Sequence, residues 1–111
     1  MRTHQIVFDE TLEPLTGDTF KESCPFDGTI INVYFQYPAG CQSLVDVAVG
    51  HGSERCFPHK GYIALDDAHP AFDVEEAVPK GEEIWAEINN GDSAYDHRII
   101  IILTIREGVS K

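Results

Sequence analysis

The segment Arg98–Arg106 constrains the fold most, because a largely β-branched run with no polar face lies between its two arginines. β-Branched residues favour strands, and successive side chains of a strand point to opposite faces. One face would carry Ile99, Ile101, Leu103 and Ile105, and the other Ile100, Ile102 and Thr104. A small domain with a single core covers one face of such a strand. The sequence therefore predicts that another subunit or a ligand covers the second face.

Length and charge narrow the classes of protein that the chain can represent. Its 111 residues are expected to form a single domain, residues 1–111. Nineteen acidic against eight basic residues give a formal net charge of −11, which opposes binding to nucleic acids and anionic membranes. No apolar run approaches the roughly 20 residues of a membrane helix. The N-terminal residues lack the apolar stretch of a signal peptide, so a cytoplasmic location is the default expectation.

The chain has an odd number of cysteines, Cys24, Cys41 and Cys56. Their spacing matches no zinc or redox motif. We expect free, partly buried thiols in a reducing compartment, and a single disulfide with one free thiol is the alternative.

Short alternating segments between turn residues predict eight or nine strands and no amphipathic helix. The expected strands are Gln5–Phe8, Thr19–Glu22, Gly28–Tyr37, Ser43–Val49, Arg55–Phe57, Tyr62–Leu65, Phe72–Val78, Glu82–Ile88 and the isoleucine strand. In Gly28–Tyr37, the odd positions from Ile31 onward suit the core face. The pattern favours an antiparallel β-sandwich with jelly-roll topology. An immunoglobulin fold is disfavoured because Trp85 follows all three cysteines.

If the last two strands formed a hairpin with a symmetric loop, Trp85 would lie opposite Ile100 on the outer face. Glu83 would then face Ile102, and Glu87 would pair with Arg98 across the strands. This register predicts a contiguous apolar patch of Trp85, Ile100 and Ile102, with Glu83, Glu87 and Arg98 at its rim.

Three occupants of this patch are compatible with the sequence. We favour a second copy of the chain, giving a dimer or trimer, because Trp is enriched at the centres of interfaces. A loop or the N-terminal segment of the same chain is one alternative. A glycan is the other, with Trp85 and Tyr34 stacking on sugar rings and nearby carboxylates binding hydroxyl groups.

Two groups of residues have side chains that bind metals. His51, Cys56, His59 and His69 could form a transition-metal or zinc site, although their spacing matches no known ligand pattern. Asn89, Asn90, Asp92 and Asp96 carry oxygens that suit calcium, although the same residues are typical of an ordinary loop. We therefore predict no cofactor, and treat calcium and zinc as alternatives.

No nucleophile–base pattern, phosphate-binding glycine loop or dinucleotide motif is present in the sequence, so we predict no enzymatic activity. The favoured interpretation is a non-catalytic, homo-oligomeric β-sandwich with a structural, assembly or accessory role. A carbohydrate-binding module is the first alternative, and a small metal-dependent enzyme at the histidine-rich loops is the second.

Overall fold

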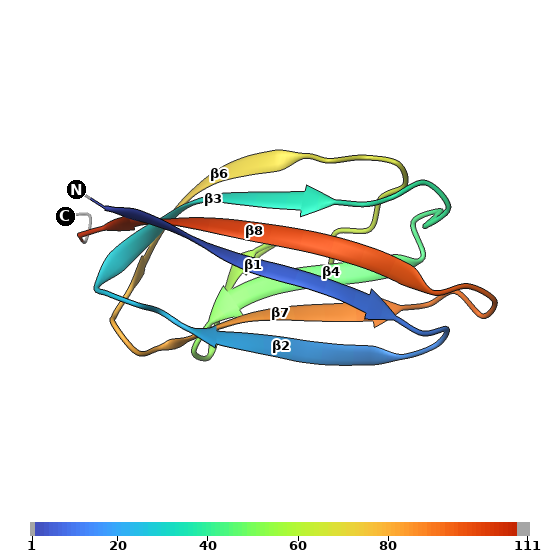
Figure 1. Cartoon of the computed structure of the whole chain (residues 1–111), viewed down its shortest axis with the longest axis horizontal. Coiled ribbons are helices and arrows are strands. Elements are labelled where there is room, and N and C mark those ends of the chain that lie inside the picture. The colour runs from blue at the N-terminus through green and yellow to red at the C-terminus, as the bar shows by residue number, and fades with distance from the viewer. Residues whose placement is uncertain (1, 109–111) are drawn as a thin grey trace.

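The computed structural model describes residues 2–108, which form eight β-strands and no helix (Figure 1). The strands are β1 (Thr3–Leu12), β2 (Gly17–Ser23), β3 (Gly28–Gln36), β4 (Val45–His51), β5 (Glu54–Phe57), β6 (Ala71–Val78), β7 (Glu83–Asn90) and β8 (His97–Glu107). This confirms the all-β fold class and the predicted number of strands.

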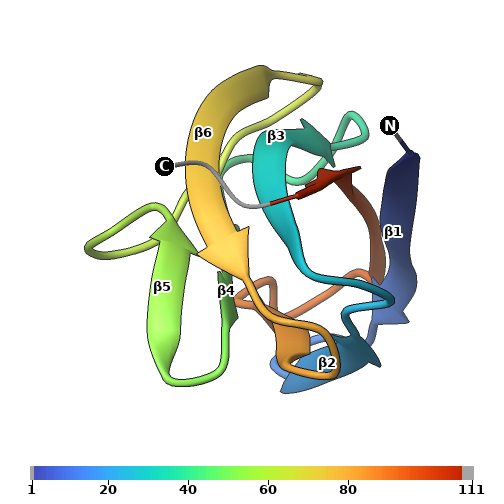
Figure 2. The same ribbon diagram turned by 90° about the vertical axis from the view of Figure 1, so that its left-hand side faces the viewer.

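Two antiparallel four-stranded sheets face each other, as the end-on view in Figure 2 shows. The first sheet, sheet A, has the order β1-β8-β3-β6, and the second, sheet B, has the order β2-β7-β4-β5. Strand β1 thus pairs with β8, β2 with β7, β3 with β6, and β4 with β5. This nested pairing, in which a long hairpin folds over into two sheets, is the jelly-roll arrangement that the sequence predicts.

The core lies between the sheets and is formed by alternate side chains of the strands. In β8, the predicted inner set is completely buried: Ile99, Ile101, Leu103 and Ile105 have 0% exposure. Strand β8 occupies an inner position of sheet A, because β1 pairs with one of its edges and β3 with the other. The isoleucine strand therefore carries a large share of the core on one face.

The predicted core face of β3 is wrong at its first position. The register of β3 against both neighbours shifts between Ile30 and Asn32, which indicates a β-bulge. The bulge puts Ile30 in the core together with Val33, whereas Ile31 is only partly buried. The predicted alternation of inner and outer side chains from Ile31 onward did not include the extra residue of the bulge.

The predicted strand Tyr62–Leu65 is also absent as a regular strand. Only Ile63 pairs there, through an isolated bridge to Val47. The Tyr37 hydroxyl group donates a hydrogen bond of 2.6 Å to the Ile63 carbonyl group. The segment is thus fixed to the edge of β4 without forming a full strand.

All three cysteines are free, as expected, and they are almost completely buried instead of partly buried. Burial raises the pKa of the Cys56 thiol to about 12. The thiol is therefore protonated near neutral pH and behaves as a small apolar core residue.

Candidate functional site

The predicted patch of Trp85, Ile100 and Ile102 is wrong, because its members lie on different sheets. In β7, Trp85 lies opposite Lys21 of β2 and Gly50 of β4. In β8, Ile100 and Ile102 lie opposite residues of β1 and β3. The loop of residues 91–96 carries the chain from one sheet to the other, and so β7 and β8 do not form a hairpin.

The predicted rim pairs change for the same reason. Glu83 faces Ser23 of β2, and Glu87 faces Thr19. Arg98 instead donates two hydrogen bonds to the Asp9 carboxylate, of 2.8 and 2.7 Å. These bonds hold the pKa of Asp9 below its usual value. The two outer faces of the sandwich must therefore be considered separately.

The outer face of sheet A presents a row of apolar side chains across three strands. Val7 of β1, Ile102 of β8 and Tyr34 of β3 lie directly opposite one another in the register. Ile100 adjoins the row, and both isoleucines are only partly covered by the chain itself. Val7 is 50% exposed. The prediction that the second face of the isoleucine strand points outward is thus confirmed, although Trp85 does not join it.

Polar groups border this row, which we call the sheet A apolar row (Val7, Tyr34, Ile100 and Ile102). The Asp9–Arg98 ion pair lies at one end, with an N–O distance of 2.7 Å. Toward the other end, the Asn32 side chain donates a hydrogen bond of 3.3 Å to Asp73. An apolar centre with a polar border is the usual composition of a protein interface.

Trp85 lies on the outer face of sheet B in a different setting. Its indole N–H donates a hydrogen bond of 3.0 Å to the Gly52 carbonyl group. The ring covers Gly50, where an added Cβ would collide with it. A shallow cavity of about 290 Å³ adjoins the ring, and it is lined by Thr19, Lys21, Gly52, Trp85 and Glu87. A tryptophan beside a hydroxyl group, an amine and a carboxylate forms a polar site with one aromatic wall.

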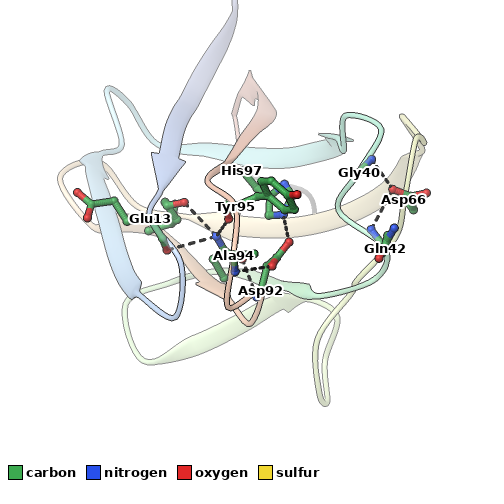
Figure 3. A network of polar contacts seen from close by, with 10 residues as sticks. Glu13, Gly40, Gln42, Asp66, Asp92, Ala94, Tyr95 and His97 are labelled. Atoms are coloured by element: carbon green, nitrogen blue, oxygen red, sulfur yellow. Dashed lines mark hydrogen bonds and ion pairs between the residues drawn. The ribbon is translucent and has the colours of Figure 1, made fainter.

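A larger cavity of about 410 Å³ lies among the loops at one end of the sandwich. Its lining residues are Ala39, Gly40, Gln42, Leu44, Asp92, Tyr95, Asp96 and His97. Figure 3 shows the buried side chain of His97 pointing toward Asp92, with 2.8 Å between Nε2 of His97 and Oδ2 of Asp92. This hydrogen bond is the main reason that the pKa of Asp92 is lowered.

Two carboxylates at this end of the sandwich, Asp92 and Asp66, bind the protein's own backbone. Oδ1 of Asp92 accepts a 2.8 Å hydrogen bond from the Ala94 N–H group. Across the cavity, Oδ1 of Asp66 accepts hydrogen bonds from the N–H groups of Gly40 and Gln42, both 2.9 Å (Figure 3). The carboxylates of Asp92 and Asp66 therefore hold the loops in place.

The four calcium candidates lie in different environments and have different hydrogen-bond partners. Asn90 is buried and binds backbone groups of Leu12, at the end of β1, and of Asp92 and Tyr95, in the loop of residues 91–96. Asn89 instead lies on the outer face of sheet B, where its side chain donates a hydrogen bond to Glu87. Asp92 binds His97, and Asp96 is exposed at the cavity. The proposed oxygen cluster does not form around one point.

The transition-metal candidates are likewise separated in their environments. His51 is buried at the inner side of β4, and its ring nitrogens lie 3.1 Å from Glu76 and 3.3 Å from Glu82. Cys56 belongs to the core, whereas His59 and His69 are exposed. Within residues 2–108, no group of three or more His, Cys, Asp or Glu side chains has the geometry to hold a metal ion.

Two residues, Glu76 and Asn90, have structural roles that were not predicted from the sequence. Glu76 interrupts the apolar alternation of β6, and the structure shows it bonded to His51 of the facing sheet. A charged residue at a core position of β6 was the one feature of the sequence that could have indicated this role. Asn90 resembled an ordinary loop residue, and its place at the inner end of β7 gave no separate indication of its hydrogen bonds.

Comparisons with known proteins support the fold and go no further. No protein-family model matches the sequence, and no curated protein matches it. The crystal structure of FLHE is similar in fold, with a TM-score of 0.52 and 16% sequence identity. The match covers 96% of this chain and 97% of FLHE. In residues 2–108, no helix has the length and apolar character needed to cross a membrane.

Proposed function

We propose that this protein is a non-catalytic β-sandwich module that assembles with copies of itself. The observation that carries the proposal is the sheet A apolar row, which projects from three adjacent strands, β1, β8 and β3. Full burial of a large aliphatic side chain contributes roughly 1.5–3 kcal/mol, and the partly covered residues here contribute less. A two-fold contact uses the row twice, and so the gain can exceed the cost of association.

The distribution of charge also favours this face over the rest of the surface. The register places three carboxylates (Asp9, Asp73 and Glu75) and two guanidinium groups (Arg98 and Arg106) on the outer face of sheet A. The chain as a whole carries a net charge of −11. Two copies therefore meet with less electrostatic repulsion on this face than the total charge implies.

The substitution Ile102→Glu tests the proposal. A carboxylate at the centre of the row would remain unpaired in the contact, which is expected to raise the dissociation constant by about 100-fold or more. We expect light scattering after size-exclusion chromatography to give a lower mass for Ile102→Glu than for the wild type. Thr104→Glu, on the same face beyond the row, is the matched control. An equal mass for wild type and Ile102→Glu would contradict assembly through this row.

A carbohydrate-binding role is the second candidate, and the cavity beside Trp85 is the observation that favours it. Thr19, Lys21 and Glu87 supply hydrogen-bonding groups next to the indole ring. Because Trp85 is the only tryptophan, we expect its fluorescence to report sugar binding directly. A saturable shift with a panel of mono- and oligosaccharides, lost in Glu87→Gln, would support this role. A flat response across the panel would count against it.

A further inference from the structure

We propose that the free edge of β1 pairs with the β1 edge of a second copy, joining two sheets A into one continuous antiparallel sheet. The inference rests on the proposed self-assembly and identifies a second contact, distinct from the outer face. Strand β1 is at the end of sheet A, and among residues 2–108 it pairs only with β8. In Figure 2, β1 lies at the margin of the molecule opposite β5.

Strand β1 lacks most of the features that normally prevent an edge from pairing. Short length, lysine, proline and β-bulges are such features, and so are charged side chains, of which β1 has Asp9 and Glu10. Its ten residues pair with β8 in an unbroken register, and they include no proline, glycine or lysine. The other edge strands differ: β5 has four residues, β2 contains Lys21, and β6 pairs with β3 through an irregular register.

The sequence of β1 is complementary to itself when it is read in the opposite direction. With Val7 on a two-fold axis, Ile6 faces Phe8 of the second copy on the core side. His4 faces Glu10 of the second copy on that side too, and Thr3 faces Thr11 on the outer side. Apolar residues thus meet apolar residues, and the basic side chain meets an acid.

Alternative registers that keep the core faces aligned are less favourable. A shift of two residues in one direction brings Phe8 opposite His4, and a shift in the other brings Ile6 opposite Glu10. A shift of one residue would place core-side residues of one copy opposite outer-face residues of the other. Glu10 has no ion-pair partner within residues 2–108, and so it is available to His4 of the second copy.

Edge pairing would also extend the sheet A apolar row. Val7 is the outermost member of the row, and on the two-fold axis it would meet Val7 of the second copy. The row would then run from Tyr34 of one copy to Tyr34 of the other. Two dimers formed by edge pairing could then pack against each other through this extended row. If the two-fold axis of that contact is perpendicular to the axis of the edge contact, the result is a closed tetramer of dihedral symmetry.

Charge reversal at β1 tests the edge contact. In His4→Glu, each of the two His4–Glu10 pairs becomes a like-charge pair, and we expect the edge contact to weaken roughly tenfold. The double variant His4→Glu/Glu10→Lys should restore it, because the charges are exchanged. His69→Glu, in an exposed loop, is the matched control. Equal dissociation constants for wild type, His4→Glu and the double variant would overturn the inference.

Cysteine crosslinking tests the register independently of affinity. Under mild oxidation, Val7→Cys should form a disulfide-linked dimer on a non-reducing gel, because position 7 faces itself. Thr3→Cys should not, whereas Thr3→Cys/Thr11→Cys should. The native cysteines are buried and should leave the wild type uncrosslinked. An oligomer in which Val7→Cys crosslinks no better than Thr3→Cys would overturn the register.

These results separate the two contacts. If Ile102→Glu leaves a dimer that still crosslinks through Val7→Cys, the edge contact is supported and the face contact has been removed. If Ile102→Glu yields monomers and position 7 never crosslinks, self-assembly through the face stands and the edge inference fails. If Ile102→Glu leaves the mass unchanged while position 7 crosslinks, the face contact fails and the edge alone joins the copies.

Discussion

Ile101→Ala is expected to lower the free energy of unfolding by about 2–5 kcal/mol, the usual range for removing an isoleucine side chain from a packed core. Ile101 is fully buried, and it lies on β8 between β1 and β3. The surrounding strands are joined by their hydrogen bonds and so can close the cavity only in part. Chemical denaturation followed by tryptophan fluorescence measures the loss.

Ile100→Ala is the matched control for this substitution, since it removes the same atoms from the adjacent position on the opposite face. Ile100 is only partly buried, and we expect a loss near 1 kcal/mol, in proportion to the smaller apolar area. If Ile101→Ala does not fold, Ile101→Val, with an expected loss of about 0.5–1.5 kcal/mol, keeps the comparison measurable. Equal losses at the two positions would contradict the assignment of faces in β8.

Asn90→Asp is expected to be the most destabilising conservative substitution at the loop end of the sandwich. The Asn90 amide nitrogen donates to the carbonyl groups of Leu12, Glu13 and Tyr95, at 3.0, 3.2 and 3.0 Å. Its side-chain oxygen accepts a hydrogen bond of 2.9 Å from the Asp92 N–H group. The variant keeps the shape of the side chain and removes both N–H donors, and an ionised carboxylate would then face carbonyl oxygens.

We expect Asn90→Asp to cost several kcal/mol at neutral pH, since each buried polar group left without a partner costs about 1–3 kcal/mol. Asn89→Asp makes the same chemical change at the preceding residue, on the outer face of sheet B. It should cost about 1 kcal/mol, because the hydrogen bond with Glu87 is replaced by a repulsion between two carboxylates that solvent screens at the surface. Denaturation midpoints of the two variants give the comparison, and similar midpoints would show that Asn90 does not hold the loops together.

The strands could be predicted from the sequence because their alternation is local. The two faces of β8 follow from residue spacing alone, and so both the buried set and the outward Ile100 and Ile102 agree with the structure. The bulge in β3 could not be predicted in the same way, because it depends on the register with neighbouring strands.

The position of Trp85 shows why the candidate site was harder to predict than the fold. Residues 91–96 could close a hairpin or cross between sheets, and their composition suits either path. The crossing depends on non-local contacts: Asn90 binds backbone groups near the end of β1, and Gly50 leaves room for the Trp85 ring. Because these partners are distant in the sequence, their spacing gives no signal of the contact.

The solution mass of the wild-type protein, measured by size-exclusion chromatography with light scattering, tests the central claim most directly. The proposed self-assembly predicts a mass above that of one 12.4 kDa chain, with four copies when the face and edge contacts both form. The mass should fall on dilution and in Ile102→Glu. A 12.4 kDa species at every concentration, including hundreds of micromolar, would contradict self-assembly and leave the Trp85 cavity as the better-supported site.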